Sequence, residues 1–331
     1  MSIVEKKIDE FEPGDKVDGF FIIRNMEKRT STNGKIFYDL TVIDNTGSIN
    51  TKIWEAEKGE GFAANDFVKI RGEVTVWKDM KQFKVHKIRK VEETDDVSLD
   101  DYVRSAPFRG SEMLETVKSY IRDMKNDDIK RLTMAMVESK EEKLLYYPAA
   151  KENHHAIRAG LLYHILRMLK SGEKLLEVYD SLDSDYVYSG VILHDLAKIE
   201  EMDSNELGIV SEYTTEGKLL GHIIQGIKDI DRMGIKLGID EEISMLIQHM
   251  ILSHHYYPDY GSPKFPMIPE AELLHYLDII DARLYDMDKA LKELKPGEFS
   301  PRIWTLDNRQ IYKRKNKTDK TDDDENTESM E

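Results

Sequence analysis

The chain carries ten histidines, and their distribution is its main chemical signal. Nine of them lie within residues 154–275, and only His86 lies in the first half. The sharpest feature is the pair His194-Asp195, which directly follows the apolar run of residues 191–193. Burying an imidazole and a carboxylate at the end of an apolar helix is costly unless a partner compensates both groups. A divalent metal ion would be such a partner, so the pair predicts a metal site.

Further candidate ligands lie on other predicted helices, far apart in the sequence. They are His164, His222, His254, His255 and Asp278. Nitrogen and oxygen donors together suit Mn²⁺, Fe²⁺, Co²⁺ or Zn²⁺ better than Ca²⁺, which prefers oxygen alone. With His194 and Asp195, this set is too large for one tetrahedral ion. It is large enough for two ions that share a bridging carboxylate, an arrangement suited to in-line displacement at phosphorus.

The order of these residues resembles the HD superfamily of metal-dependent phosphohydrolases. The resemblance implies that one ion is held by His164, His194, Asp195 and Asp278. A second ion would share Asp195 and take His222 with either His254 or His255. The catalytic residues implied are Asp195 and Lys198, with Lys198 of the His-Asp-x-x-Lys motif near the substrate phosphate. Ala197 stands where the superfamily often has glycine, and this change leaves every expected ligand in place.

The resemblance extends well beyond this signature. Residues 153–164, 190–196, 252–255 with 261–264, and 295–298 are similar to the YhaM-type 3′–5′ exoribonucleases of Gram-positive bacteria. The similarity covers nearly the whole chain except its acidic tail. It implies a hydrolase that releases nucleoside 5′-monophosphates from the 3′ end of single-stranded RNA, with single-stranded DNA as a second candidate substrate. The implied cofactor is a pair of divalent ions, with Mn²⁺ expected first and Co²⁺, Fe²⁺ or Mg²⁺ as alternatives.

Other polar residues are expected to support the metal site. Asp281 lies three positions after Asp278, on nearly the same helix face, so we expect it to orient a ligand histidine. His249 is expected either in a similar supporting role one turn from the site or in the core. The histidines at 154–155 either contact substrate or cap a helix.

The two halves of the chain differ in the period of their apolar residues. Residues 14–92 predict five short strands separated by turn signals, which fits a small closed barrel. From residue 111 the period is helical. The predicted fold class is therefore an N-terminal five-stranded OB-fold β-barrel followed by an all-α HD-type helical domain. The expected divisions are an N-terminal extension (1–13), the barrel (14–92), a linker (93–110), the helical domain with a C-terminal extension (111–312), and a disordered acidic tail (313–331).

The barrel sequence carries aromatic and basic residues suited to gripping a single strand. Aromatic rings stack on bases, and basic side chains follow the phosphates. Strict alternation would place Lys81, Phe83, Val85, Lys87 and Arg89 on one face of the last strand. The predicted contact residues are Phe37, Tyr38, Trp54, Trp77, Lys81, Phe83, Lys87 and Arg89. The alternative is that the aromatics fill the small barrel and the basic run is a solvated edge strand.

Composition narrows the class of protein. A chain of 331 residues with 40% hydrophobic and 34% charged residues indicates a globular protein of one large or two smaller domains. No apolar run approaches the roughly 18 residues of a membrane span, and the N-terminus lacks the apolar core of a signal peptide. The chain has no cysteine, which excludes disulfide and thiolate chemistry and favours the cytoplasm. The net charge of −16 argues against general nucleic-acid binding, so a strand would need a local basic groove.

Two other functions remain open from the sequence. An HD-type phosphodiesterase acting on a nucleotide or cyclic dinucleotide would not need a strand-binding barrel. A non-catalytic single-stranded DNA-binding protein in replication would not need the complete ligand set. We expect no membrane partner, and assembly into a homo-oligomer is left open.

Overall fold

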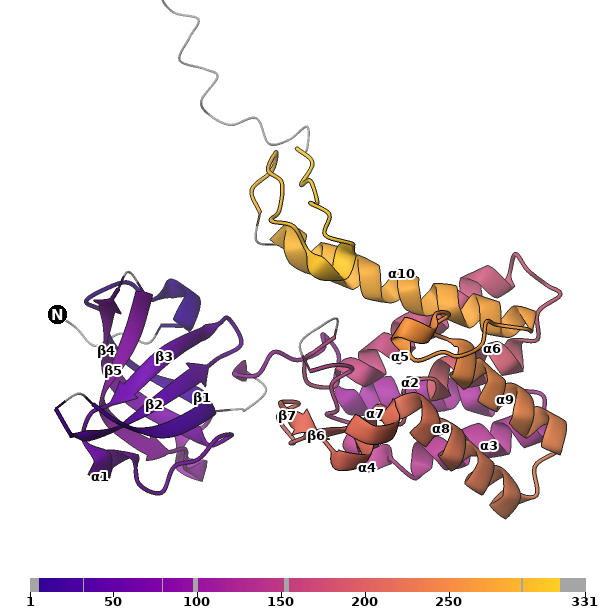
Figure 1. The fold of residues 1–331 in the computed structure, drawn as a ribbon, viewed down its shortest axis with the longest axis horizontal. Coiled ribbons are helices and arrows are strands. Elements are labelled where there is room, and N and C mark those ends of the chain that lie inside the picture. The colour runs from indigo at the N-terminus through magenta and orange to yellow at the C-terminus, as the bar shows by residue number, and fades with distance from the viewer. Residues whose placement is uncertain are drawn as a thin grey trace, which may run out of the picture.

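The protein folds as a β-barrel followed by a helical domain (Figure 1). The structure is a computed structural model that describes residues 6–31, 33–78, 80–97, 101–151, 155–292 and 294–315. His154 and all but the first residues of the expected acidic tail lie outside the described residues. Every helix in the described ranges is too short or too polar to cross a membrane.

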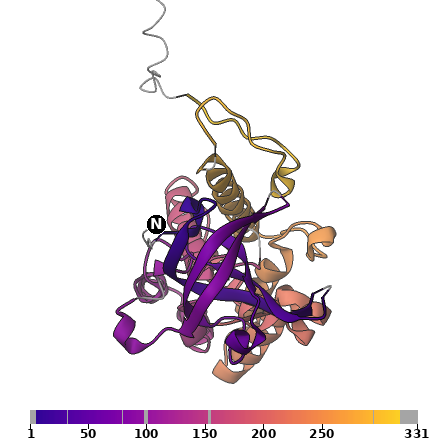
Figure 2. The same cartoon turned by 90° about the vertical axis from the view of Figure 1, so that its left-hand side faces the viewer.

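The barrel has the strand order of an OB-fold. Five strands close on themselves in the order β1-β2-β3-β5-β4, and only the β3–β5 pair is parallel. The view of Figure 2 has this barrel in front. Alternate residues of the strands fill its interior, and a one-turn helix, α1 (Ala56–Gly59), follows the third strand. The strands are β1 (Lys16–Thr30), β2 (Ile36–Ile43), β3 (Ser48–Ile53), β4 (Phe67–Trp77) and β5 (Met80–Lys90).

The barrel begins earlier than the sequence predicts. Ile8 and Phe11 are buried in its core, and the Phe11 ring lies 5.4 Å from that of Phe83. The backbone N–H of Ile8 donates to Asp44 at 2.8 Å, which ties this segment to the β2–β3 turn. Residues 8–11 are therefore part of the domain and not an extension preceding it.

A bulge in β5 overturns the expected common face for its odd-numbered residues. Arg71 pairs with Lys87 but Gly72 pairs with Val85, so His86 is an extra residue in the ladder. The inward side chains are Phe83 and Val85 before the bulge, whereas Lys87 after it is exposed. Sequence alternation fails here because a bulge shifts the period by one residue.

The helical domain is built around one apolar core, and most of its helices contribute to it. Its helices are α2 (Gly110–Arg122), α3 (Asp127–Glu138), α4 (Glu141–Leu144), α5 (Gly160–Leu176), α6 (Ser184–Leu193), α7 (Lys198–Glu201), α8 (Thr215–Leu237), α9 (Glu241–Ser253) and α10 (Pro269–Lys292). It is not entirely helical, because a small hairpin of β6 (Met202–Ser204) and β7 (Val210–Tyr213) follows α7.

The segment between the domains is partly packed. Tyr102 and Val103 share a buried cluster with Phe20 and Ile22 of the barrel and with Leu207 of the β6–β7 hairpin. Apolar contact thus fastens the expected linker to both domains.

Candidate metal centre

Five helices of the second domain bring the predicted ligands together. His164 lies on α5, His194 ends α6, and Asp195 follows it directly. One group of potential ligand atoms, all within 4.8 Å of one another, comes from Asp195, His222, His254 and His255; a second comes from His164, His194 and Asp195. Asp195 belongs to both groups.

The two oxygens of Asp195 face different histidines. Oδ1 lies 3.4 Å from Nε2 of His222 and 3.9 Å from Nε2 of His254. Oδ2 lies 3.3 Å from Nε2 of His194 and 3.9 Å from Nε2 of His164. One carboxylate between two sets of nitrogen donors is the arrangement that two ions sharing a bridging ligand require.

Asp278 joins the second group from α10. Its Oδ1 lies 3.3 Å from Nε2 of His164, which itself lies 3.3 Å from Nε2 of His194. Burial alone would lower the pKa of His164, but the carboxylates of Asp278 and Asp281 outweigh it and raise the pKa to about 9. A metal ion would take the place of the proton that this imidazole otherwise holds between two carboxylates.

Three buried polar atoms at this centre fit a metal ion. Asp195 Oδ1, His222 Nε2 and His254 Nε2 have no hydrogen-bond partner. Burial lowers the pKa of His254 well below its ordinary value, so its imidazole is neutral, the form that coordinates metal. Buried polar groups without partners are costly, and a divalent ion would satisfy all three. The donor set therefore fits the metal that the sequence predicts.

All five histidines are held so that their Nε2 atoms are the coordinating ones. In each, Nδ1 donates to a carboxylate or a carbonyl, groups that only accept, so Nε2 carries the lone pair when the ring is neutral. The acceptors are Asp281 for His164 (2.7 Å), the Val191 carbonyl for His194 (2.9 Å), Glu201 for His222 (3.2 Å), the Ile251 carbonyl for His254 (2.8 Å) and the Tyr260 carbonyl for His255 (2.5 Å).

A glycine places His222 in this centre. Gly221 interrupts α8 with φ 68° and ψ 166°, a backbone conformation that other residues rarely adopt. The second part of the helix therefore starts at His222. The backbone N–H of His222 donates to Glu201 Oε1 at 3.1 Å. Glu201 thus holds both the backbone and the ring of this histidine.

The sequence analysis missed Glu201 and Arg167 as supporting residues. Arg167 donates to the carboxylate of Asp281, which also accepts from His155 at 2.7 Å. Arg167 lies three residues after His164, a helical spacing that could have indicated a shared face. Glu201 has no such signal, because its partner is 21 positions away.

Removal of the Glu201 carboxylate should weaken metal binding. We expect Glu201→Ala to lower Mn²⁺ affinity about 10–100-fold, since outer partners of a ligand histidine have effects of this size. Glu201→Gln keeps an acceptor for Nδ1 and is the matched control, with a smaller loss. Calorimetric Mn²⁺ titration of both variants measures the difference, and equal affinities for wild type and Glu201→Ala would show that Glu201 does not position His222.

Lys198 lies beside the bridging carboxylate. Its Nζ is 2.7 Å from Asp195 Oδ2. Burial would lower the pKa of Lys198, but the charge of Asp195 raises it overall. The same ammonium and His194 hold the pKa of Asp195 well below its ordinary value against the effect of burial. Both groups are therefore charged, and a cation stands at the centre without being a ligand.

His249 has a different contact from the one expected. Its Nε2 accepts from the backbone N–H of Met267 at 2.9 Å, and neither group of clustered ligand atoms includes it. His249 therefore anchors the connection between α9 and α10 and does not orient a described ligand.

The barrel residues predicted to bind a strand divide into two sets. The rings of Phe37 and Trp54 stack at 4.8 Å, and Trp54 is 49% exposed. Trp77 and Lys87 are also exposed, and Tyr38 is partly buried.

The remaining predicted contacts are engaged elsewhere. Phe83 is fully buried in the barrel core, so its predicted stacking on bases is wrong. Arg89 forms an ion pair with Asp95, and Lys81 Nζ donates to the Phe11 carbonyl. Both cations would have to exchange these partners to bind phosphate.

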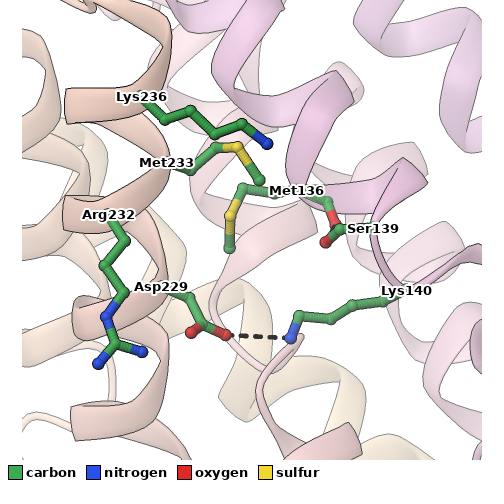
Figure 3. A pocket seen from close by; sticks show the side chains of 7 residues that line it. All are labelled: Met136, Ser139, Lys140, Asp229, Arg232, Met233 and Lys236. Carbon is green, nitrogen blue, oxygen red and sulfur yellow. Dashed lines mark hydrogen bonds and ion pairs between the residues drawn. The ribbon is translucent and has the colours of Figure 1, made fainter.

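A separate pocket of about 320 Å³ shares no residue with the metal centre. It lies between the end of α3 and the C-terminal half of α8, and Lys140 reaches across it to Asp229 at 3.0 Å (Figure 3). The opening is lined by Met136, Ser139, Lys140, Asp229, Arg232, Met233 and Lys236.

Comparison with known proteins confirms the resemblance read from the motifs. The family model described as "HD domain" matches residues 161–283. The chain is 40% identical to the 3′-5′ exoribonuclease YhaM of Bacillus subtilis (strain 168) over 304 aligned residues. The aligned region covers 91% of this chain and 96% of that protein. The chain is 41% identical, with the same coverage, to the 3′-5′ exoribonuclease YhaM of Bacillus velezensis. Among solved structures, the second OB-fold domain of replication protein A from Methanococcus maripaludis covers 27% of this chain and 97% of its own, at 19% identity and a TM-score of 0.24. By its near full-length similarity, the chain belongs to the YhaM family of proteins, whose curated members are named 3′-5′ exoribonucleases.

Proposed function

We propose that this protein is a metal-dependent 3′–5′ exoribonuclease that hydrolyses single-stranded RNA to nucleoside 5′-monophosphates. The observation that carries the proposal is the placement of Asp195 between two sets of imidazoles in a chain of this family. We propose two divalent ions, with Mn²⁺ first and Co²⁺, Fe²⁺ or Mg²⁺ as alternatives. One would be held by His164, His194, Asp195 and Asp278, and the other by Asp195, His222, His254 and His255.

The residues of the centre divide the chemistry among them. When bound, the ions supply Lewis acidity and hydroxide near neutral pH. Asp195 stays ionised and fixes the spacing of the two ligand sets, because Lys198 and His194 keep its pKa low. Lys198 supplies a fixed positive charge that can neutralise the charge developing on the phosphate oxygens. Asp281 and Glu201 keep two of the imidazoles in place through their Nδ1 atoms.

The barrel would hold the strand so that its 3′ end reaches the metal centre. The Phe37–Trp54 stack supports this role, because Trp54 is exposed and an aromatic ring can stack on any base. Lys52 lies 5.4 Å from the Phe37 ring, but its ammonium is paired with Asp39 at 2.8 Å and would have to exchange this partner to bind phosphate. Single-stranded DNA offers the same bases and phosphates, so we propose it as a second substrate.

Removal of the Trp54 ring should weaken strand binding. Trp54→Ala is expected to raise the Kd for a long single-stranded RNA by about 5- to 150-fold, corresponding to the loss of one base–aromatic stack worth about 1–3 kcal/mol. Trp304→Ala removes another exposed indole, in the C-terminal segment, and is the matched control. Fluorescence anisotropy without metal measures binding alone. Equal Kd values for Trp54→Ala and Trp304→Ala would show that the Phe37–Trp54 stack does not bind the strand.

The direction of digestion tests the function itself. Incubation of 5′-labelled single-stranded RNA and DNA with Mn²⁺ should give a ladder that shortens from the 3′ end, with 5′-monophosphates as products. Release of the labelled nucleotide first, or hydrolysis of a cyclic dinucleotide but not of the oligomers, would contradict the proposal.

We also propose a cytoplasmic location and self-association. The absence of cysteine supports the first, because extracytoplasmic proteins often depend on disulfides. Exposed apolar side chains along α10, including Tyr276, Ile280 and Leu284, support a homo-oligomer. Light scattering of the purified protein measures its assembly.

A further inference from the structure

The loop that follows the last metal-ligand histidines is unusually aromatic. It runs from residue 256 to 265 and contains Tyr256, Tyr257, Tyr260 and Phe265; we call it the tyrosine loop. The side chains of Tyr257, Tyr260 and Phe265 are 53%, 69% and 55% exposed. Large aromatic groups gathered in one exposed loop indicate a binding surface, and the chemistry described above uses none of these rings.

Hydrogen bonds hold the tyrosine loop against the metal centre. The ring of His255 donates through Nδ1 to the Tyr260 carbonyl at 2.5 Å, and its backbone N–H donates to Ser262 Oγ at 3.0 Å. Ser262 is fully buried, and Gly261 turns the chain with φ 98°. The loop is therefore held beside His255, whose ring clusters with Asp195, His222 and His254.

The rings also support one another. Tyr256 packs at 5.0 Å from Phe265 and at 4.7 Å from His275. Tyr257 lies edge-on to Phe265 at 6.4 Å with an interplanar angle of 88°, and edge-on to Tyr260 at 6.4 Å and 72°. Rings that brace each other in this way leave faces open and lose little freedom when a flat ligand stacks on them.

We propose that the rings of Tyr257, Tyr260 and Phe265 are a stacking subsite for the nucleobases at the 3′ end of the strand. The subsite rests on the proposed exonuclease function and assigns part of strand recognition to the helical domain. Continuity with His255 favours this occupant, because the loop is bonded directly to a histidine of the centre at which the terminal phosphodiester would bind. A second protein copy covering the same rings is the competing occupant, and the test separates the two.

The subsite would add recognition of nucleobases to a metal centre that recognises only the phosphodiester. The clustered donors recognise a phosphodiester, whereas stacking rings recognise flat bases of any sequence. Loss of one ring should therefore raise KM for an oligonucleotide about 10-fold, within the range known for single base–aromatic stacks. It should affect a small phosphodiester that has no nucleobase much less.

The test compares four variants of the full-length protein. Tyr257→Ala and Tyr260→Ala remove stacking rings while keeping the backbone carbonyl that holds His255. Tyr257→Phe keeps the ring, and Tyr179→Ala removes another exposed tyrosine, in the segment after α5, as a control. In the two Tyr→Ala variants of the loop, we expect KM for a single-stranded RNA oligomer to rise. This rise should exceed the change in kcat/KM for bis(p-nitrophenyl) phosphate by about 10-fold. Tyr257→Phe and Tyr179→Ala should not show this difference. Equal changes for the two substrates, or an effect of Tyr257→Phe as large as that of Tyr257→Ala, would overturn the subsite.

A binding measurement keeps this result separate from the exonuclease proposal. RNA with 2-aminopurine as its 3′-terminal base, mixed with protein in EDTA, should lose fluorescence on wild type and on Tyr257→Phe but keep it on the Tyr257→Ala/Tyr260→Ala double variant. Quenching that survives in the double variant would overturn the subsite even if RNA is degraded. Normal quenching behaviour with no RNA degradation would support the subsite and contradict the exonuclease function. If light scattering shows that the double variant forms a smaller protein assembly than wild type, the rings contact a second subunit, and the stacking subsite would be overturned.

Discussion

Replacement of Asp195 by alanine should abolish RNA hydrolysis and most metal binding. Each oxygen of this carboxylate faces a different set of imidazoles, so its loss removes a ligand from both expected ions at once. We expect turnover to fall at least about 10⁴-fold, as for central members of a catalytic set that act as a unit. Strand binding through the barrel should survive. Single-turnover RNA hydrolysis, metal analysis and anisotropy on the same sample measure the three properties.

Stability has to be controlled in this experiment, because Lys198 would lose its partner. Breaking a buried ion pair by removing one member typically costs about 3–5 kcal/mol, and the side chain of Lys198 is only 13% exposed. Asp195→Asn keeps the shape, and Asp195→Asn with Lys198→Met removes both charges together. Asp288→Ala changes an exposed aspartate of α10 and should behave as wild type. Near-normal turnover in a folded Asp195→Asn variant would falsify the role of the bridging carboxylate.

Replacement of Lys198 by alanine should separate phosphate binding from metal binding. If the ammonium neutralises the transition state, turnover should fall about 10²-fold or more, comparable to the loss of one oxyanion donor. The loaded ions would compensate Asp195, so metal content and the thermal midpoint of the holoenzyme should change little. In the metal-free protein the thermal midpoint should fall, because the buried Asp195 charge then has lost its ammonium partner.

The competing role for Lys198 is structural. As a cation at the start of α7 paired to Asp195, it could serve only to neutralise that carboxylate. Lys198→Met keeps the length of the side chain without its charge, and Lys289→Ala on α10 is an exposed control. A turnover within a few-fold of wild type in both Lys198 variants would leave the residue with a structural role alone.

The metal centre could be predicted because its donors are chemically distinctive. Burial of His194-Asp195 at the end of an apolar helix is unfavourable in free energy unless a partner compensates both groups. The concentration of the other histidines in the same half of the chain also indicated a common site. The hydrogen-bond partners of these ligands were harder to predict. Glu201 is one of 64 acidic residues, and its contact with His222 depends on the kink at Gly221, which has no local signal.

The barrel could be predicted from alternation and turns, but its detailed faces could not. The bulge at His86 shifts the alternation of β5, so Lys87 does not share the inward face of Phe83 and Val85. Ile8 and Phe11 were assigned outside the domain, because a segment without strand alternation gives no sign that it closes a barrel. In both places long-range packing overrides the local pattern.

The direct test of the account is the number and coupling of Mn²⁺ ions at Asp195. Equilibrium dialysis of the wild-type protein should give two ions per chain, and electron paramagnetic resonance should show exchange coupling between them, because one carboxylate is expected to bridge both. Asp195→Asn should lose the coupled signal while Asp288→Ala keeps it. A single uncoupled ion in the wild-type protein, or a coupled pair that persists in Asp195→Asn, would contradict a two-ion centre bridged by Asp195.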